Sequence, residues 1–122
     1  MKHSISKLIA PIIATAIVSL LGALDVAKPL GAHPFWSVNV AFYGLIPGLA
    51  FWWLFRRLGR RSVYVAFLAL IVAIAAAYFG KQAFAASYAE NTVAGKFWFY
   101  GWIATYAAVL WAIAAAFDRR NH

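Results

Sequence analysis

The sequence has 122 residues, of which 66% are hydrophobic and 11% are charged, with 11 Lys and Arg, three Asp and Glu and no cysteine. Because soluble domains usually contain about 25% charged residues, this composition predicts an integral membrane protein. The absence of cysteine excludes disulfide bonds, thiolate metal sites, iron–sulfur clusters and thiol nucleophiles.

Four uncharged apolar stretches are long enough to cross a bilayer as helices. They cover residues 8–24, 37–55, 62–80 and 97–117. A hydrocarbon core of about 30 Å requires roughly 20 helical residues, and a helix satisfies its own backbone hydrogen bonds there. We therefore expect an all-α integral membrane protein in which residues 1–122 form a single membrane domain, a bundle of four transmembrane helices.

The positive charges are distributed unevenly between the two sides of this threading. One side carries eight of them, at Lys2, Lys7, Arg56, Arg57, Arg60, Arg61, Arg119 and Arg120, and the other carries Lys28, Lys81 and Lys96. Lys and Arg near span ends stay on the cytoplasmic side, so both termini are predicted to be cytoplasmic. A bacterial cytoplasmic (inner) membrane is the expected location. The arginines of the 56–61 connection are expected to contact lipid headgroups, with no nucleic acid as a partner.

The second span has a proline between two glycines, in the order Gly44, Pro47, Gly48. Proline removes one backbone hydrogen bond and clashes with the preceding turn, so this span is predicted to kink, while the glycines let a neighbouring helix approach. Broken helices line substrate sites in transporters, but passive membrane helices contain them as well, and the passive role is favoured. Asn39, near the outer end of the same span, is expected to tie two helices together or to contact a ligand.

The fourth span carries an aromatic stripe, formed by Trp98, Trp102 and Tyr106 at intervals of four residues. This spacing places the three rings on one helix face. They could hold a flat or polyene ligand such as a quinone, a carotenoid or a lipid tail, although aromatic packing between helices is the commoner use of such a stripe. With Asn39, Gly44, Pro47 and Gly48, these residues are the candidate contacts with a ligand or partner.

Ionisable residues are concentrated outside the spans. On the predicted outer face, Asp25, Lys28, His33 and Glu90 form a candidate polar cluster that could bind a small polar group or pair internally. Inside the spans there is no Asp, Glu, Lys, Arg or His. Proton relays, ion-coupled transport, haem ligation by histidine and general-base catalysis all need such groups. We therefore expect no enzyme activity, no cofactor and no metal site.

Two partial family resemblances are visible. Lys28-Pro29, Pro34, Trp36 and Phe42-Tyr43-Gly44 resemble the loop and second helix of the tryptophan-rich sensory (translocator) proteins, but that family has five spans and a double proline. The endings Phe55-Arg56-Arg57 and Phe117-Asp118-Arg119-Arg120 are similar to those of the four-span GtrA-type proteins of lipid-linked sugar transfer, without their polar Asn-Arg signature. No ligand-binding residue is carried over from either family.

Small residues recur at helical spacing in the third and fourth spans, at Ala69, Ala73 and Ala77 and at Gly101, Ala104, Ala108, Ala112 and Ala115. Such rows allow close helix packing in lipid. The favoured function is therefore a non-catalytic accessory or structural subunit, with membrane lipids and a larger membrane complex or further copies of the chain as partners. The alternative is a free-standing carrier or binder of a lipid, a lipid-linked or another hydrophobic molecule, which would use the kinked span and the aromatic stripe. A pore former is a distant third.

Overall fold

The computed structural model describes residues 2–26, 28, 29, 39–59, 61–87 and 92–117, and for residues 2–8 and 92 it describes the backbone alone. Across these ranges the chain is all-helical and contains no strand. Its elements are α1 (Lys2–Ala23), α2 (Asn39–Tyr43), α3 (Leu45–Leu54), the short 3-10 helix η1 (Arg56–Leu58), α4 (Arg61–Ala86) and α5 (Thr92–Phe117).

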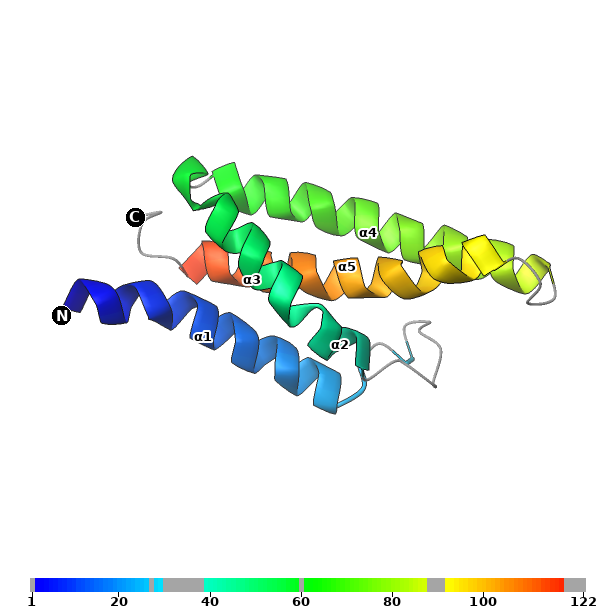
Figure 1. Ribbon diagram of the computed structural model, residues 1–122, viewed down its shortest axis with the longest axis horizontal. Helices are drawn as coiled ribbons and strands as arrows, with labels where there is room; N and C mark the ends of the chain where they lie inside the picture. Colours follow the sequence, from blue (N-terminus) through cyan, green and yellow to red (C-terminus); the bar gives the residue numbers. More distant parts are fainter. Residues whose placement is uncertain (1, 27, 30–38, 60, 88–91, 118–122) are drawn as a thin grey trace.

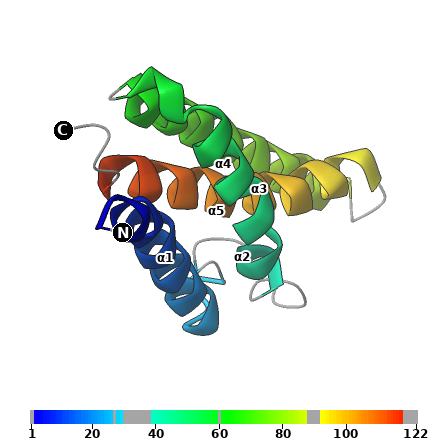
Figure 2. The same cartoon turned by 60° about the vertical axis from the view of Figure 1, so that its left-hand side comes forward.

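Helix α5 is the centre of this arrangement, because it contacts each of the other α-helices. In Figures 1 and 2 it lies between α4 on one side and α1 on the other, with α2 and α3 crossing it. The start of α1, the end of α5 and the connection from α3 to α4 lie at one end of the molecule (Figure 1). Successive long helices therefore alternate in direction.

Two of the four predicted spans form helices that are long and apolar enough to cross a membrane, namely α4 and the Val93–Phe117 part of α5. The other two form shorter apolar helices, Ile9–Ala23 and Asn39–Leu54, and residues 37 and 38 of the second predicted span lie outside the described residues. A buried core helix of a soluble protein would pass the same test of length and composition. The all-helical fold is thus confirmed, and the four-span threading stays a prediction.

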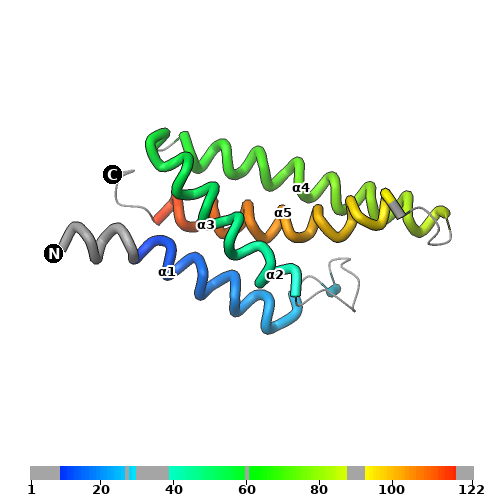
Figure 3. The backbone as a smooth tube through the Cα atoms, viewed as in Figure 1, coloured from blue at the N-terminus to red at the C-terminus, as the bar shows by residue number. Residues whose placement is uncertain are grey.

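The second predicted span is interrupted at Gly44, between α2 and α3. Pro47 has no N–H to donate to the carbonyl of Tyr43, four residues earlier, so the hydrogen-bond ladder lacks this bond next to Gly44. The backbone of Gly44 itself stays in the right-handed helical region, with φ −79° and ψ −13°. The Gly44 N–H still bonds to the Val40 carbonyl at 3.0 Å. The two helices consequently follow one another along one path, as the tube in Figure 3 shows.

One end of the core combines a buried hydrogen bond with stacked rings. The Nε1–H of Trp111 on α5 donates to the Oγ of Ser62 on α4 at 2.9 Å, and both side chains are buried. The ring of Trp111 also stacks on Phe51 and Phe55, at centroid distances of 5.7 and 5.1 Å. These contacts join α3, α4 and α5 near the arginine-rich connection.

Glycines set the distance between α4 and α5. A Cβ added to Gly101 would lie 2.6 Å from the backbone nitrogen of Ala77, and one added to Gly80 would lie 2.6 Å from the backbone nitrogen of Trp98. Real Cβ atoms essentially never come so close to a backbone atom. The two helices therefore touch backbone to backbone, which requires glycine at both positions.

Replacing Gly101 by alanine should force α4 and α5 apart and lower the free energy of unfolding by about 1 to 3 kcal/mol, the usual cost of overpacking. The matched control is Gly95→Ala on the same helix, where the new Cβ meets only the Phe84 ring, at 3.0 Å. Alanine stabilises a helix relative to glycine by up to about 1 kcal/mol, which should offset the cost of that contact. Denaturant titration of the purified protein in micelles measures both values. Equal effects of the two substitutions would contradict the close seam.

Candidate ligand pocket and outer groove

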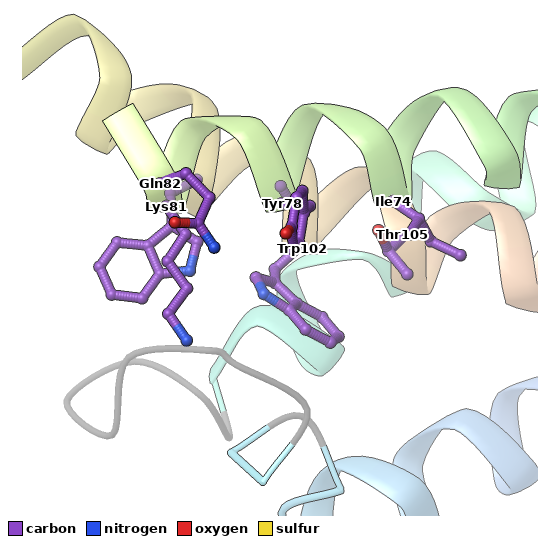
Figure 4. A pocket seen from close by; sticks show the side chains of 8 residues that line it. Ile74, Tyr78, Lys81, Gln82, Trp102 and Thr105 are labelled. Carbon is purple, nitrogen blue, oxygen red and sulfur yellow. The ribbon is translucent and has the colours of Figure 1, made fainter. Parts of the chain in front are cut away.

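A pocket of about 420 Å³ opens between α4 and α5 (Figure 4). Its lining residues come from both helices and are Ile74, Ala77, Tyr78, Lys81, Gln82, Trp98, Trp102 and Thr105. The α4 members recur at the three- and four-residue spacing of a single helix face. Because α4 continues beyond Gly80 to Ala86, two polar side chains, Lys81 and Gln82, extend this face.

The pocket is polar at one end and apolar at the other. Figure 4 shows Lys81 and Gln82 at one end, Tyr78 and Trp102 in the middle, and Ile74 and Thr105 at the far end. The Thr105 hydroxyl donates to the Gly101 carbonyl of its own helix at 2.7 Å, so its proton is already used. The lysine ammonium, the glutamine amide, the tyrosine hydroxyl and the indole N–H of Trp102 are therefore groups that can bind a polar ligand.

The predicted aromatic stripe divides between the pocket and the core. Trp98 is 8% exposed, lines the pocket and packs on Phe84 at a centroid distance of 5.8 Å. Trp102 is half-buried and also lines the pocket. Tyr106 is 5% exposed, belongs to the core cluster and contacts Trp102 at 6.1 Å without lining the pocket. Two of the three rings are therefore available as pocket walls.

The candidate residues of the second predicted span do not join this pocket. A Cβ at Gly44 would lie 3.0 Å from the Ile103 carbonyl oxygen, and one at Gly48 would lie 2.9 Å from the Ala107 carbonyl oxygen. Helix α5 thus packs against the glycine face, which is the close approach of a neighbouring helix that these glycines were predicted to allow. Asn39 is exposed and Pro47 is half-buried, and neither lines the pocket between α4 and α5.

The predicted polar cluster on the outer face is described only in part, since His33 and Glu90 lie outside the described residues. Asp25 ends α1 in a Schellman motif: it has a φ of 57°, its N–H bonds to the Gly22 carbonyl, and the Val26 N–H bonds to the Leu21 carbonyl. Its buried Oδ1 accepts no hydrogen bond from the described residues, and Lys28 is exposed. Within the described ranges no three His, Cys, Asp or Glu side chains are grouped to hold a metal ion.

The pocket was not predicted from the sequence, in which Lys81 belongs only to the ionisable residues of the predicted outer face. The signal that could have found it is the spacing of Ile74, Tyr78 and Lys81, which continues the apolar helix face into polar residues. The partners of these residues, Trp98 and Trp102, are distant in sequence and could not be assigned to them.

A second cavity, the outer groove, lies on the other side of the contact between α4 and α5. It is open, has a volume of about 510 Å³ and is lined by Val65, Leu68, Ala69, Val72, Ala73, Ala76, Phe97, Tyr100, Gly101 and Ala104. Half of these residues are alanine or glycine. The outer groove therefore presents backbone and methyl groups that a long apolar partner could approach closely.

Searches of protein-family models, curated proteins and solved structures found no match to this chain.

The two pocket tryptophans should differ in their effect on stability. Trp98→Ala removes a buried ring from between α4 and α5 and should cost about 3 kcal/mol or more of unfolding free energy. Trp102→Ala removes a half-buried pocket wall and should cost about 1 kcal/mol. Denaturant titration in micelles distinguishes them, and a larger loss for Trp102 would contradict the assignment of the two walls.

Proposed function

We propose that this chain is a non-catalytic integral membrane protein that packs as an accessory subunit against a larger membrane complex. The observation that carries the proposal is the outer groove, whose floor of small residues remains uncovered by the other described helices.

The exposure of α4 supports a lipid environment. Only 22% of its most apolar window is buried. Eight of its large side chains are at least 50% exposed, namely Tyr64, Phe67, Leu68, Ile71, Val72, Ile74, Tyr78 and Phe79. In water, each square ångström of such apolar surface would cost about 25 cal/mol. A soluble core helix would be covered and a signal sequence would lie near the N-terminus, whereas α4 begins at Arg61.

The outer groove supports a helical partner. In lipid, helices gain little by covering apolar side chains, so their association depends on close approach at small residues. Ala77 and Gly80 of α4 already serve this purpose against α5. Ala69, Ala76 and Ala104 lie in the outer groove and form a second small-residue surface. A transmembrane helix of another subunit can approach such a surface closely.

The predicted orientation can be tested with single cysteines, because the natural chain contains none. Gln82 and Arg57 are both exposed, near opposite ends of the molecule. In spheroplasts of a bacterial host, a membrane-impermeant maleimide should label Gln82→Cys, whereas Arg57→Cys should react only after permeabilisation. The reverse pattern would invert the orientation, and labelling of both without permeabilisation would contradict the membrane-spanning arrangement.

The partner can be tested by filling the outer groove. Ala104 is exposed, so Ala104→Leu should fill the groove without disturbing the fold, and Ala116→Leu is a matched change at an exposed position of α5 outside the groove. After extraction in mild detergent, size separation and mass spectrometry, the wild type and Ala116→Leu should migrate with a larger complex. Ala104→Leu should reduce this fraction about tenfold, because overpacking an interface costs one or more kcal/mol.

Two results of the same experiment would contradict an accessory subunit. The wild-type chain could migrate alone, or it could migrate only with further copies of itself. Unchanged migration of Ala104→Leu with the complex would assign the contact to a different face of the molecule.

A further inference from the structure

We propose that the pocket between α4 and α5 binds one anionic phospholipid, with its headgroup at Lys81 and Gln82 and an acyl chain running past Trp102 towards Ile74. This inference rests on the proposed membrane placement and is independent of the subunit partner. The occupant is taken from the bilayer and is bound through both its charge and its chain.

The charge at the polar end selects an anion. Lys81 is half-buried, and its ammonium is the one cationic group among the residues that line the pocket, where a charged hydrogen bond to an anion is the strong interaction available to it. Among the described residues Asp25 is the only acid, and it forms no ion pair with Lys81. Gln82 is exposed at the same end of the pocket, and its amide supplies N–H donors. An ammonium and an amide together match the oxygens of a phosphodiester.

The rest of the pocket matches a hydrocarbon chain. From Lys81 to Ile74 the lining extends over seven residues of α4, about 10 Å along the helix axis. The walls on this path are the rings of Trp98, Trp102 and Tyr78 with Ala77 and Ile74, so they are apolar apart from the tyrosine hydroxyl and the indole N–H groups, and the Thr105 hydroxyl at the far end donates to its own helix. Because this largely apolar path continues from a cationic group, the pocket suits an amphiphile better than a small polar anion. A neutral quinone would leave the ammonium without a partner.

The location of the pocket agrees with a lipid ligand. Lys81 follows immediately after the uncharged stretch 62–80, so its ammonium lies where that stretch would meet the headgroups. The pocket and the outer groove lie on different faces of α4. The pocket is lined by residues 74, 77, 78, 81 and 82 of this helix, and the outer groove by residues 65, 68, 69, 72, 73 and 76. A lipid in the pocket therefore leaves the outer groove free for a partner.

The test is native mass spectrometry of the purified full chain in micelles containing equal amounts of phosphatidylglycerol and phosphatidylcholine. We expect one phosphatidylglycerol to be retained in preference to phosphatidylcholine. Lys81→Gln should lower that preference about tenfold, because it removes a hydrogen bond between charged groups. Lys96→Gln makes the same charge change at an exposed residue outside the pocket and should leave the preference unchanged.

A second variant tests the chain path. Ile74 is 50% exposed, so Ile74→Trp should fill the apolar end without a buried clash and should lower retention of both lipids about tenfold. Glycerol phosphate, added as the free headgroup, should not displace the lipid at equal concentration. Displacement by glycerol phosphate would overturn the lipid assignment in favour of a free phosphate ligand.

Other outcomes would also overturn the proposal. If Lys81→Gln and Lys96→Gln lowered the preference for phosphatidylglycerol equally, that preference would come from the overall charge of the protein and not from the pocket. Unchanged lipid retention in Lys81→Gln or Ile74→Trp would exclude the pocket as the site. Because the purified chain contains no partner, failure here would leave the accessory-subunit proposal standing. Failure of Ala104→Leu to release a complex would likewise leave the lipid result unaffected.

Discussion

The contact between the backbones of α4 and α5 determines how the rest of the molecule is arranged. At Gly101 and Gly80 each helix approaches the other to a distance that leaves no space for a Cβ. Such a contact permits very little rotation of one helix against the other, because a small rotation brings a side chain into the seam. It therefore defines which residues border the pocket on one side of the seam and which border the outer groove on the other.

Close backbone contact at glycine residues occurs a second time on α5. Gly44 and Gly48 bring the interrupted second helix against Ile103 and Ala107, so a different face of α5 is closed by backbone contact. The break caused by Pro47 is compatible with this packing and does not open a site. Tyr106, facing this contact, is buried, whereas Trp98 and Trp102 lie where α5 faces the pocket. One row of aromatic residues thus serves both packing and the pocket.

Three polar residues of the described chain have structural roles. The Ser62 hydroxyl accepts from Trp111, the Thr105 hydroxyl donates to Gly101, and Asp25 adopts the left-handed conformation that ends α1. Lys81 and Gln82 differ, because they lie at the mouth of a pocket and hold no such internal contact among the described residues. This division supports binding, to a helical partner and to a lipid, as the proposed function.

The sequence by itself determined the helical class, the approximate positions of the helices and a break in the second predicted span, which the structure places at Gly44, because hydropathy and backbone hydrogen bonding depend on residues close together in the chain. It also predicted that Trp98, Trp102 and Tyr106 share a face, since a spacing of four residues does so in any helix. Only the tertiary structure decided that Tyr106 is buried, that α5 closes the glycine face and that Lys81 lines the same pocket as Trp98 and Trp102. Those outcomes depend on how far apart two helices lie and how each is rotated, and the glycine seam sets both through contacts between residues distant in sequence.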